Sequence, residues 1–201
     1  MLLQWSAPEY VPRSFLVSGV SGTNKAVKQT DTSFRLTKQV ADGLVDMQEV
    51  SKGLFLVQSE MAFKKETELC EEYPERKVFQ LSFCMNGICE WDYRQKRGEH
   101  YQLSPTQCSL QCGTFSQCVS RFGSEEPYRT LSISLEQERF LPLAEDLEAA
   151  HLIRRDDKIC THVFSTTPEI RLVLQQLLDC PPERKLRKLY LEGKVLELLS
   201  L

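Results

Sequence analysis

The sequence predicts an α+β protein in which a β-barrel or jelly roll is followed by two C-terminal helices. Short segments between residues 51 and 135 alternate apolar and polar side chains, the pattern of half-buried strands. Turn residues separate these segments at intervals of about ten residues, as in sandwiches and small barrels. After Ser165 the apolar residues recur at the helical period instead, which marks the end of the β part.

We divide the chain into three parts. With 41% hydrophobic and 26% charged residues, the 201-residue chain has the composition of an ordinary globular protein. Residues 1–50 are polar and rich in turn residues, so we expect an N-terminal arm with outer strands. Residues 51–145 are predicted to form the β-barrel core, and residues 165–201 a helical segment for dimerisation and for linkage to a following domain.

The strand pattern is clearest in residues 78–85 and 130–135, where every second residue is apolar. Asn86-Gly87 directly follows the first of these segments, and residues 89–93 then alternate again. A strand, an Asn-Gly pair and a second strand predict a β-hairpin. Residues 136–143, in contrast, are predicted to form only a helical turn that leads into a loop.

Two helices are predicted near the C-terminus. Residues 165–167 offer capping hydroxyls, Pro168 suits a first helical turn, and an apolar stripe continues to Leu178. Pro181-Pro182 ends this helix, and a second helix runs from about residue 183 to Leu201. Because the chain stops within an apolar helical pattern and without a C-cap glycine, we expect the natural protein to continue.

Charge and hydropathy narrow the function class. The formal net charge of −3 argues against nucleic-acid binding as the main work of this segment, because phosphate neutralisation needs a clustered basic surface. No apolar run is long enough for a transmembrane helix, and the first residues lack the features of a secretory signal. We therefore expect a cytoplasmic protein.

No catalytic or metal-binding motif stands out. The three histidines, His100, His151 and His162, do not form the His-x-His pair of a metal-binding cupin, and the eight cysteines do not form CxxC pairs. We therefore predict no catalytic residue, no metal and no cofactor. The cysteines are expected to be thiols that fill the core, with metal sensing and redox sensing as alternatives. Cys108, Cys112 and Cys118 share parity and would point into one barrel unless Gly113 interrupts the strand.

The β segment also suggests a ligand pocket, since such pockets are mostly apolar with a few polar groups. Among Arg121, Arg129 and Arg139, only Arg129 lies at the alternate positions of Leu131 and Ile133, so it is the candidate to point inward and pair with an anionic ligand; the alternative is a solvated side chain. The same aromatic residues serve equally well as plain core. The predicted pocket residues are Phe79, Phe83, Trp91, Tyr93, Cys108, Leu110, Cys112 and Arg129.

The last helix carries two apolar stripes. Leu191, Val195 and Leu198 form one stripe, and the other contains Leu186, Leu189, Tyr190, Leu196 and Leu199. One stripe docks a helix on its own domain, whereas two stripes need two partners. We therefore expect a homodimer with this helix at its centre; the alternative is that both stripes are buried within one subunit. The predicted dimer residues are Leu186, Leu189, Tyr190, Gly193, Leu196 and Leu199.

Residues 185–199, with the continuous run from Leu189 to Leu199, resemble the linker helix of AraC-type bacterial transcriptional regulators, particularly the subgroup related to siderophore-responsive regulators. The resemblance implies a cupin-like effector-binding and dimerisation domain, with DNA bound only through a C-terminal helix-turn-helix domain absent from these residues. It also implies a small-molecule effector, for which a siderophore-type iron complex is one candidate, and no membrane partner. The rival interpretations are a metal-dependent cupin enzyme and a ligand-free dimerisation scaffold.

Overall fold

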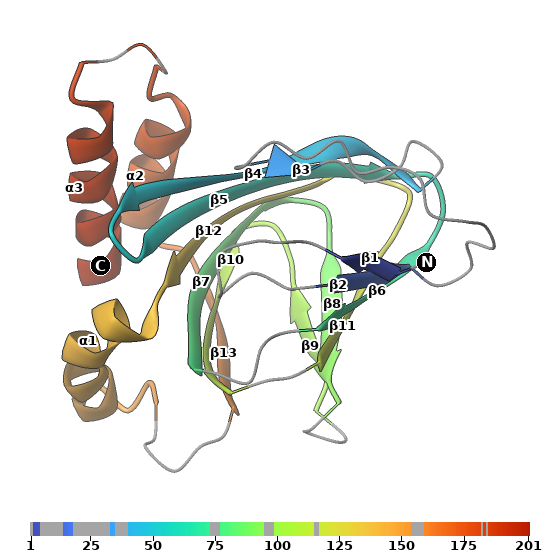
Figure 1. Ribbon diagram of the computed structural model, residues 1–201, viewed down its shortest axis with the longest axis horizontal. Coiled ribbons are helices and arrows are strands. Elements are labelled where there is room, and N and C mark those ends of the chain that lie inside the picture. Colours follow the sequence, from blue (N-terminus) through green and yellow to red (C-terminus); the bar gives the residue numbers. More distant parts are fainter. Residues whose placement is uncertain are drawn as a thin grey trace.

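The structure, a computed structural model, describes residues 2–4, 14–17, 33–34, 40–72, 77–94, 99–114, 117–153, 159–181, 183 and 185–201. Within these residues the chain forms two β-sheets and three helices, and one sheet lies between the other sheet and the helices (Figure 1). In spatial order, sheet A contains β1 (Leu2–Gln4), β2 (Ser14–Val17), β6 (Thr67–Glu72), β11 (Gln117–Phe122), β8 (Cys89–Tyr93) and β9 (Tyr101–Leu103). Sheet B contains β13 (Ile159–Ser165), β10 (Gln107–Thr114), β7 (Lys77–Asn86), β12 (Tyr128–Leu135), β5 (Leu54–Phe63), β4 (Ala41–Ser51) and β3 (Ser33–Phe34).

The strands from β5 to β12 have the connectivity of a jelly roll. Successive strands mostly cross from one sheet to the other, so that β5, β12, β7 and β10 are neighbours in sheet B. The strands β6, β11, β8 and β9 are neighbours in sheet A, and the pairs are antiparallel. This is a double-sheet jelly roll. The predicted class, an α+β cupin-like jelly roll followed by two C-terminal helices, is confirmed.

The predicted hairpin at Asn86-Gly87 is wrong. The turn joins β7 of sheet B to β8 of sheet A, so it forms a corner between the sheets rather than a ladder between neighbouring strands. Gly87 has a φ of 73°, and a Cβ atom there would lie 2.9 Å from the carbonyl oxygen of Pro127. The corner arises because Cys84 before the turn and Trp91 after it are buried in one core between the sheets. Local turn chemistry is the same in both arrangements, so the sequence alone did not distinguish them.

Sheet B has a core on each of its faces. The outer core lies between sheet B and the helices, and the inner core lies between the two sheets. The outer core includes Leu56, Phe79, Leu81, Phe83, Leu110, Leu131, Ile133 and Leu135 from the sheet and Ile170, Val173, Leu174, Leu177, Leu191, Val195 and Leu198 from the helices. The inner core includes Val45, Met61, Phe63, Leu69, Cys84, Cys89, Trp91, Tyr93, Leu103, Cys118, Phe122 and Ile159.

Helix α2 (Pro168–Leu178) agrees with its prediction, while α1 (Gln137–Ala149) is longer than the single turn expected for its first residues. The Thr167 hydroxyl accepts a hydrogen bond from the backbone N–H of Ile170 at 3.2 Å, which caps the start of α2. Pro142 lies inside α1, and because proline disfavours a helix interior, local propensity predicted only a helical turn there. Burial of Phe140, whose ring stacks on Phe79 at 5.0 Å, fixes α1 on the sheet.

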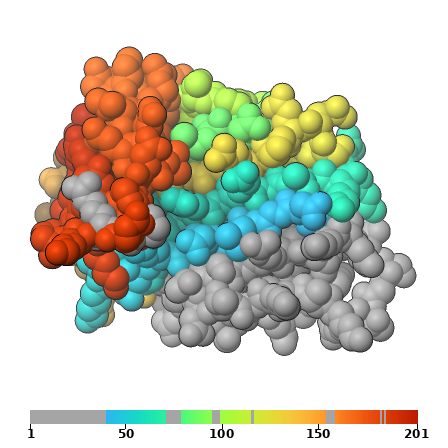
Figure 2. All heavy atoms as spheres, turned by 90° about the horizontal axis from the view of Figure 1, so that it is seen from above, coloured from blue at the N-terminus to red at the C-terminus, as the bar shows by residue number. Residues whose placement is uncertain are grey.

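Helix α3 (Arg187–Ser200) ends the chain beside α2, and the two helices occupy one end of the molecule (Figures 1 and 2). Strands β4 and β5 run along the molecule from these helices (Figure 2). The boundary predicted at residue 50 falls inside β4, which pairs with β5 along almost its whole length. Gly43 permits this pairing, because its φ is 151° and a Cβ atom would lie 2.0 Å from the Glu60 carbonyl oxygen. Strand β13, which pairs with β10, was not predicted either.

Candidate functional site

The inner face of sheet B is polar along its central strands. Ser82 on β7 lies opposite Ser109 on β10 and Ser132 on β12, and all three are buried. The hydroxyl oxygens of Ser82 and Ser132 are 2.8 Å apart, and Gln80 Nε2 donates to Ser82 Oγ at 2.9 Å. On the same strands, Leu81 and Ile133 point the opposite way, into the outer core beneath the helices. The barrel therefore has a polar wall on the inner face of sheet B.

The Tyr93 hydroxyl extends this wall toward sheet A. It donates to Gln111 Oε1 at 2.7 Å, and Gln111 Nε2 in turn donates to Ser109 Oγ at 3.2 Å. Burial raises the pKa of Tyr93 far above its ordinary value, so the hydroxyl stays protonated. The side chains of Trp91 and Thr161 also interact with this hydroxyl and lower its pKa, and their Nε1 and Oγ1 atoms are buried. We call Tyr93, Gln111, Trp91 and Thr161 the Tyr93 cluster.

The pocket residues predicted from the sequence fall into separate places. Trp91 and Tyr93 lie in the inner core, as a barrel pocket requires. The remaining aromatic, thiol and leucine candidates lie on the opposite face of sheet B, in the outer core. The alternation along each strand separated its two faces, but it did not show which face of the strand turned toward the inside of the barrel. The candidates on the outer face are Phe79, Phe83, Cys108, Leu110 and Cys112.

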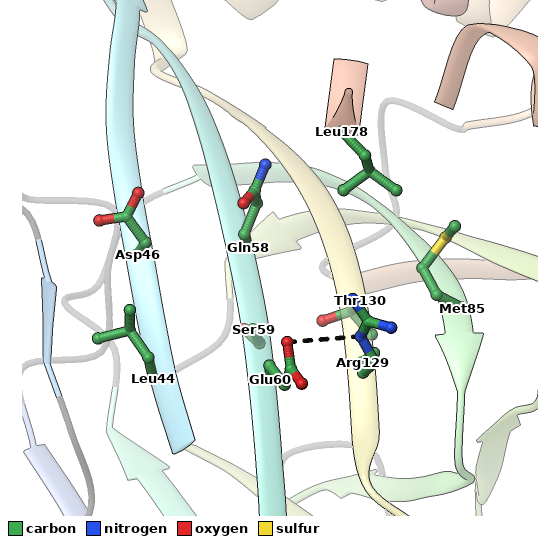
Figure 3. Close-up of a pocket in the computed structure, with 9 residues that line it drawn as sticks. All are labelled: Leu44, Asp46, Gln58, Ser59, Glu60, Met85, Arg129, Thr130 and Leu178. Carbon is green, nitrogen blue, oxygen red and sulfur yellow. Dashed lines mark ion pairs between the residues drawn. The ribbon is translucent and has the colours of Figure 1, made fainter. Parts of the chain in front are cut away.

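Arg129 does not point inward, and its alternative, a solvated side chain, agrees with the structure. Arg129 shares the face of Leu131 and Ile133 as predicted, but that face is the outer one. Its side chain is 55% exposed, and its Nε atom lies 3.5 Å from the Glu60 carboxylate. Arg129 and Glu60 help to line a groove of about 190 Å³ beside α2 (Figure 3). This volume is below the roughly 300–1,000 Å³ of typical ligand pockets.

Further polar and apolar side chains complete that groove. Burial raises the pKa of Asp46, and the nearby positive charge of Arg187 partly opposes this shift. Figure 3 shows Met85 and Leu178 on the side opposite Asp46. Both apolar side chains are more than a third exposed. The groove is thus an open surface feature with mixed charge, and the Tyr93 cluster is the better candidate site.

One face of α3 is exposed and apolar. Leu191, Val195 and Leu198 are buried in the outer core, which identifies the stripe that docks the helix on its own domain. On the opposite face Leu189 is 64% and Leu196 is 53% exposed. Between them a Cβ atom on Gly193 would meet no atom beyond its own helix backbone within 4 Å, so no described residue of this subunit requires a glycine there.

The other predicted dimer residues divide between the two environments. Leu186 is exposed and precedes the first turn of α3 with a left-handed φ of 58°. Tyr190 and Leu199 pack partly against the outer core, and the Tyr190 hydroxyl donates to the Gln176 carbonyl oxygen of α2 at 3.4 Å. We call Leu186, Leu189, Gly193 and Leu196 the open α3 face.

The cysteines lie in both cores. All eight are buried thiols, and burial raises the pKa of Cys84 to about 11 and that of Cys108 to about 12. Cys108 and Cys112 lie in the outer core, whereas Cys118 lies in the inner one, so these three do not gather in one barrel. Within the part of the chain that the structure describes, no group of three or more His, Cys, Asp or Glu residues is arranged to hold a metal ion.

A family model described as the N-terminal domain of the regulatory protein PchR matches residues 42–201. Among solved structures, the AraC-like transcriptional activator CuxR is 8% identical, with a TM-score of 0.53 over 80% of this chain and 56% of CuxR. Apo ToxT K231A from Vibrio cholerae strain SCE256 is 12% identical, with a TM-score of 0.52 over 76% of this chain and 55% of ToxT. The chain therefore spans about half the length of either protein.

These structural likenesses show the fold. A comparison with curated proteins gave no match. Among the described helices, none combines the length and apolar character needed to cross a bilayer. Because the family model covers most of the chain, this protein belongs to the family of PchR-type regulatory N-terminal domains, and its fold is that of the N-terminal domain of an AraC-type regulator.

Proposed function

We propose that this chain is the effector-sensing and dimerisation domain of a bacterial, cytoplasmic transcriptional regulator. The DNA-binding domain of that regulator lies outside these residues, which fits the half-length coverage of CuxR and ToxT. The observation that carries the proposal is that sheet B has a polar inner face at the Tyr93 cluster and an apolar outer face beneath α2 and α3. One sheet thus links the polar wall, which we propose as the effector contact, with the helix that we propose as the contact to a partner subunit.

Signal transfer follows from the alternation of side chains along the strands. Ser132 lies on the polar wall that faces the inner core, and the next residue, Ile133, contacts the outer core that holds α3. A shift of β7 or β12 on effector binding therefore displaces the surface on which α3 packs. Such coupling requires the effector to bind two states of the domain with different affinities.

The open α3 face is the proposed dimer contact. Leu189 and Leu196 are one heptad step apart, which keeps them on one side of a helix that packs against a second helix. Gly193 lies between them and permits two backbones to approach closely, which offsets a helix-propensity cost of about 1 kcal/mol. A second copy of the chain is the proposed occupant of this face.

Two measurements test the regulator assignment. Native mass spectrometry of the full-length regulator, purified from its own host, is expected to show a dimer with a copurified small molecule, and iron–siderophore complexes are the first candidates for added effector. A saturating effector is expected to stabilise the domain; at one hundred times its Kd the gain is about 2.7 kcal/mol. Absence of any stabilising compound favours a ligand-free scaffold, and a stoichiometric metal bound without a siderophore favours the metal-dependent enzyme.

DNA binding is tested separately by gel shift. We expect the full-length regulator to bind its promoter selectively and residues 1–201 alone not to do so. Tight, sequence-selective binding by residues 1–201 would contradict the assignment of DNA recognition to another domain.

A further inference from the structure

Two cysteines face each other across the outermost described ladder of sheet B. Strand β13 pairs with β10 in an antiparallel register that places Cys160 directly opposite Cys112. Both side chains belong to the outer core, so they lie on the same face of the sheet, and they are 8% and 7% exposed. Among the described strand pairs, no other register sets one cysteine opposite another.

The register brings these two thiols within reach of a disulfide. Residues directly opposite each other in an antiparallel pair have Cα atoms about 4.5 or 5.5 Å apart, depending on their place in the hydrogen-bond pattern. Both values lie within the roughly 4.4–6.8 Å that disulfides span. The Cβ atoms of such a pair are about 4.5–5.5 Å apart, slightly more than the mean of about 3.8 Å in disulfides. Closing this difference strains the bond, and a strained disulfide is readily reduced again.

We propose that Cys112 and Cys160 form a redox-modification site, which a small-molecule disulfide such as oxidised glutathione converts into a reversible cross-strand disulfide. The Cys160 thiolate attacks one sulfur of the glutathione disulfide, whose S–S bond breaks, and one glutathione leaves and takes up a proton. The Cys112 thiolate then attacks the Cys160 sulfur and displaces the second glutathione in the same way. The two protein thiols thus lose two electrons and two protons, which the glutathione disulfide gains. The site stands whether or not the barrel binds an effector.

The disulfide acts on the strand that leads into the C-terminal helices. Strand β13 ends at Ser165 and α2 begins at Pro168, so a bond to β10 holds the base of that connection. Oxidation also removes one contact, because Cys160 Sγ donates to the Leu152 carbonyl oxygen at 3.2 Å and a disulfide sulfur has no hydrogen to donate. We therefore expect oxidation to hold β13 more tightly and to loosen the backbone beside Leu152.

A redox titration with disulfide mapping tests the site. We would equilibrate the reduced 201-residue chain at graded ratios of oxidised to reduced glutathione, quench with acid, and alkylate the remaining thiols after unfolding. Chymotrypsin cuts after Leu110 and Phe115, which separates Cys112 from the cysteines on either side of it. The expected product is a pair of peptides linked through Cys112 and Cys160. Its amount is expected to rise with the ratio and to vanish with excess dithiothreitol.

Hydrogen exchange and matched variants test what the bond does. In the oxidised protein the β13 amides are expected to exchange at least about tenfold more slowly, and those beside Leu152 faster. Cys112→Ala and Cys160→Ala are expected to abolish both the linked peptides and the slower exchange. Cys108→Ala is the control, because Cys108 lies on the same strand face as Cys112 but opposite Phe164, and it is expected to preserve both. Circular dichroism verifies that each variant is folded.

The wild-type mapping decides the proposal even if a variant does not fold. The proposal is refuted if both thiols are still alkylated after equilibrium with the most oxidising buffer. Linkage of Cys160 to Cys108 or Cys180, or a link that forms only after the protein unfolds, would refute the pairing that the register gives. Unchanged exchange of β13 in the linked protein would contradict the effect on the strand.

Discussion

The two stripes of α3 predict opposite outcomes for the same substitution made two residues apart. Leu198 is 3% exposed and packs in the outer core, whereas Leu196 is 53% exposed on the open α3 face. Truncating a buried leucine typically destabilises a domain by 2–5 kcal/mol, and a buried carboxylate adds to this. Leu198→Glu is therefore expected to lower the free energy of unfolding by about 4 kcal/mol. At 2–4 °C per kcal/mol for a chain of this size, Tm falls by roughly 8–16 °C.

Leu196→Glu is expected to leave the fold intact and to separate the subunits. A charge on an exposed helix face changes the stability of a single subunit by no more than about 0.5 kcal/mol. Two facing carboxylates at a dimer seam repel each other and lose hydration, so the variant is expected to be a folded monomer. Light scattering gives the mass and circular dichroism the fold, at several protein concentrations because dimerisation contributes to Tm.

Ile88→Glu is the matched control for this pair. Ile88 is an apolar residue exposed to a similar degree, 49%, in the corner between β7 and β8. We expect this variant to remain a dimer of wild-type stability. The reasoning is refuted if wild-type protein is a monomer at high concentration, if Leu196→Glu stays dimeric, or if Leu198→Glu is as stable as wild type.

Four other measurements test separate parts of the structure. Gly193→Ala is expected to raise the helix stability of a monomeric form by about 1 kcal/mol and yet to weaken dimerisation, which sedimentation at graded concentrations detects. Thr167→Ala is expected to lower the free energy of unfolding by about 1 kcal/mol in urea denaturation, since it removes the cap of α2. Burial raises the pKa of Asp92, but hydrogen bonds, first of all from Arg121, outweigh it and lower the pKa overall; the stabilisation is therefore complete above the ordinary aspartate value near 3.9 and is lost as pH falls through the lower folded value. Asp92→Asn is thus expected to cost about 0.5–1 kcal/mol at pH 7 and nothing in strong acid, as pH-dependent thermal unfolding would show. With a pKa of about 11, the Cys84 thiol is expected to resist a thiol reagent at pH 8 until the protein unfolds, and rapid labelling of the native protein would contradict its burial.

The regular elements were predictable from sequence because their signals are local. Alternation located β7 and β12, and a capping hydroxyl with a following proline located the start of α2. The wrong predictions concern which elements pack or pair with each other. Asn86-Gly87 predicts a reversal of the chain, but a hairpin and a corner between sheets use the same turn residues, and only the burial of both flanking strands in the inner core decides between them.

The candidate site was predicted in part, for a related reason. Parity placed Trp91 with Tyr93 and Phe79 with Phe83, and both groupings agree with the structure. Parity does not say which face of a strand turns toward the barrel, and the usual expectation is that the more apolar face does. In sheet B this expectation fails, because the helices cover the outer face and bury its leucines and phenylalanines there.

The inverted polarity of sheet B is itself an argument about function. A barrel that served only as a solid core would gain more stability from apolar residues than from serines, because every buried polar group needs a hydrogen-bond partner to offset its lost hydration. Ser82 and Ser132 hydrogen-bond to each other, and Gln80 donates to Ser82, so these side chains have hydrogen-bond partners without a ligand. Substituting Thr161 by valine tests whether the Tyr93 cluster serves the fold alone: a gain in stability without loss of effector binding would mark a packing role, whereas a loss of binding would mark a ligand contact.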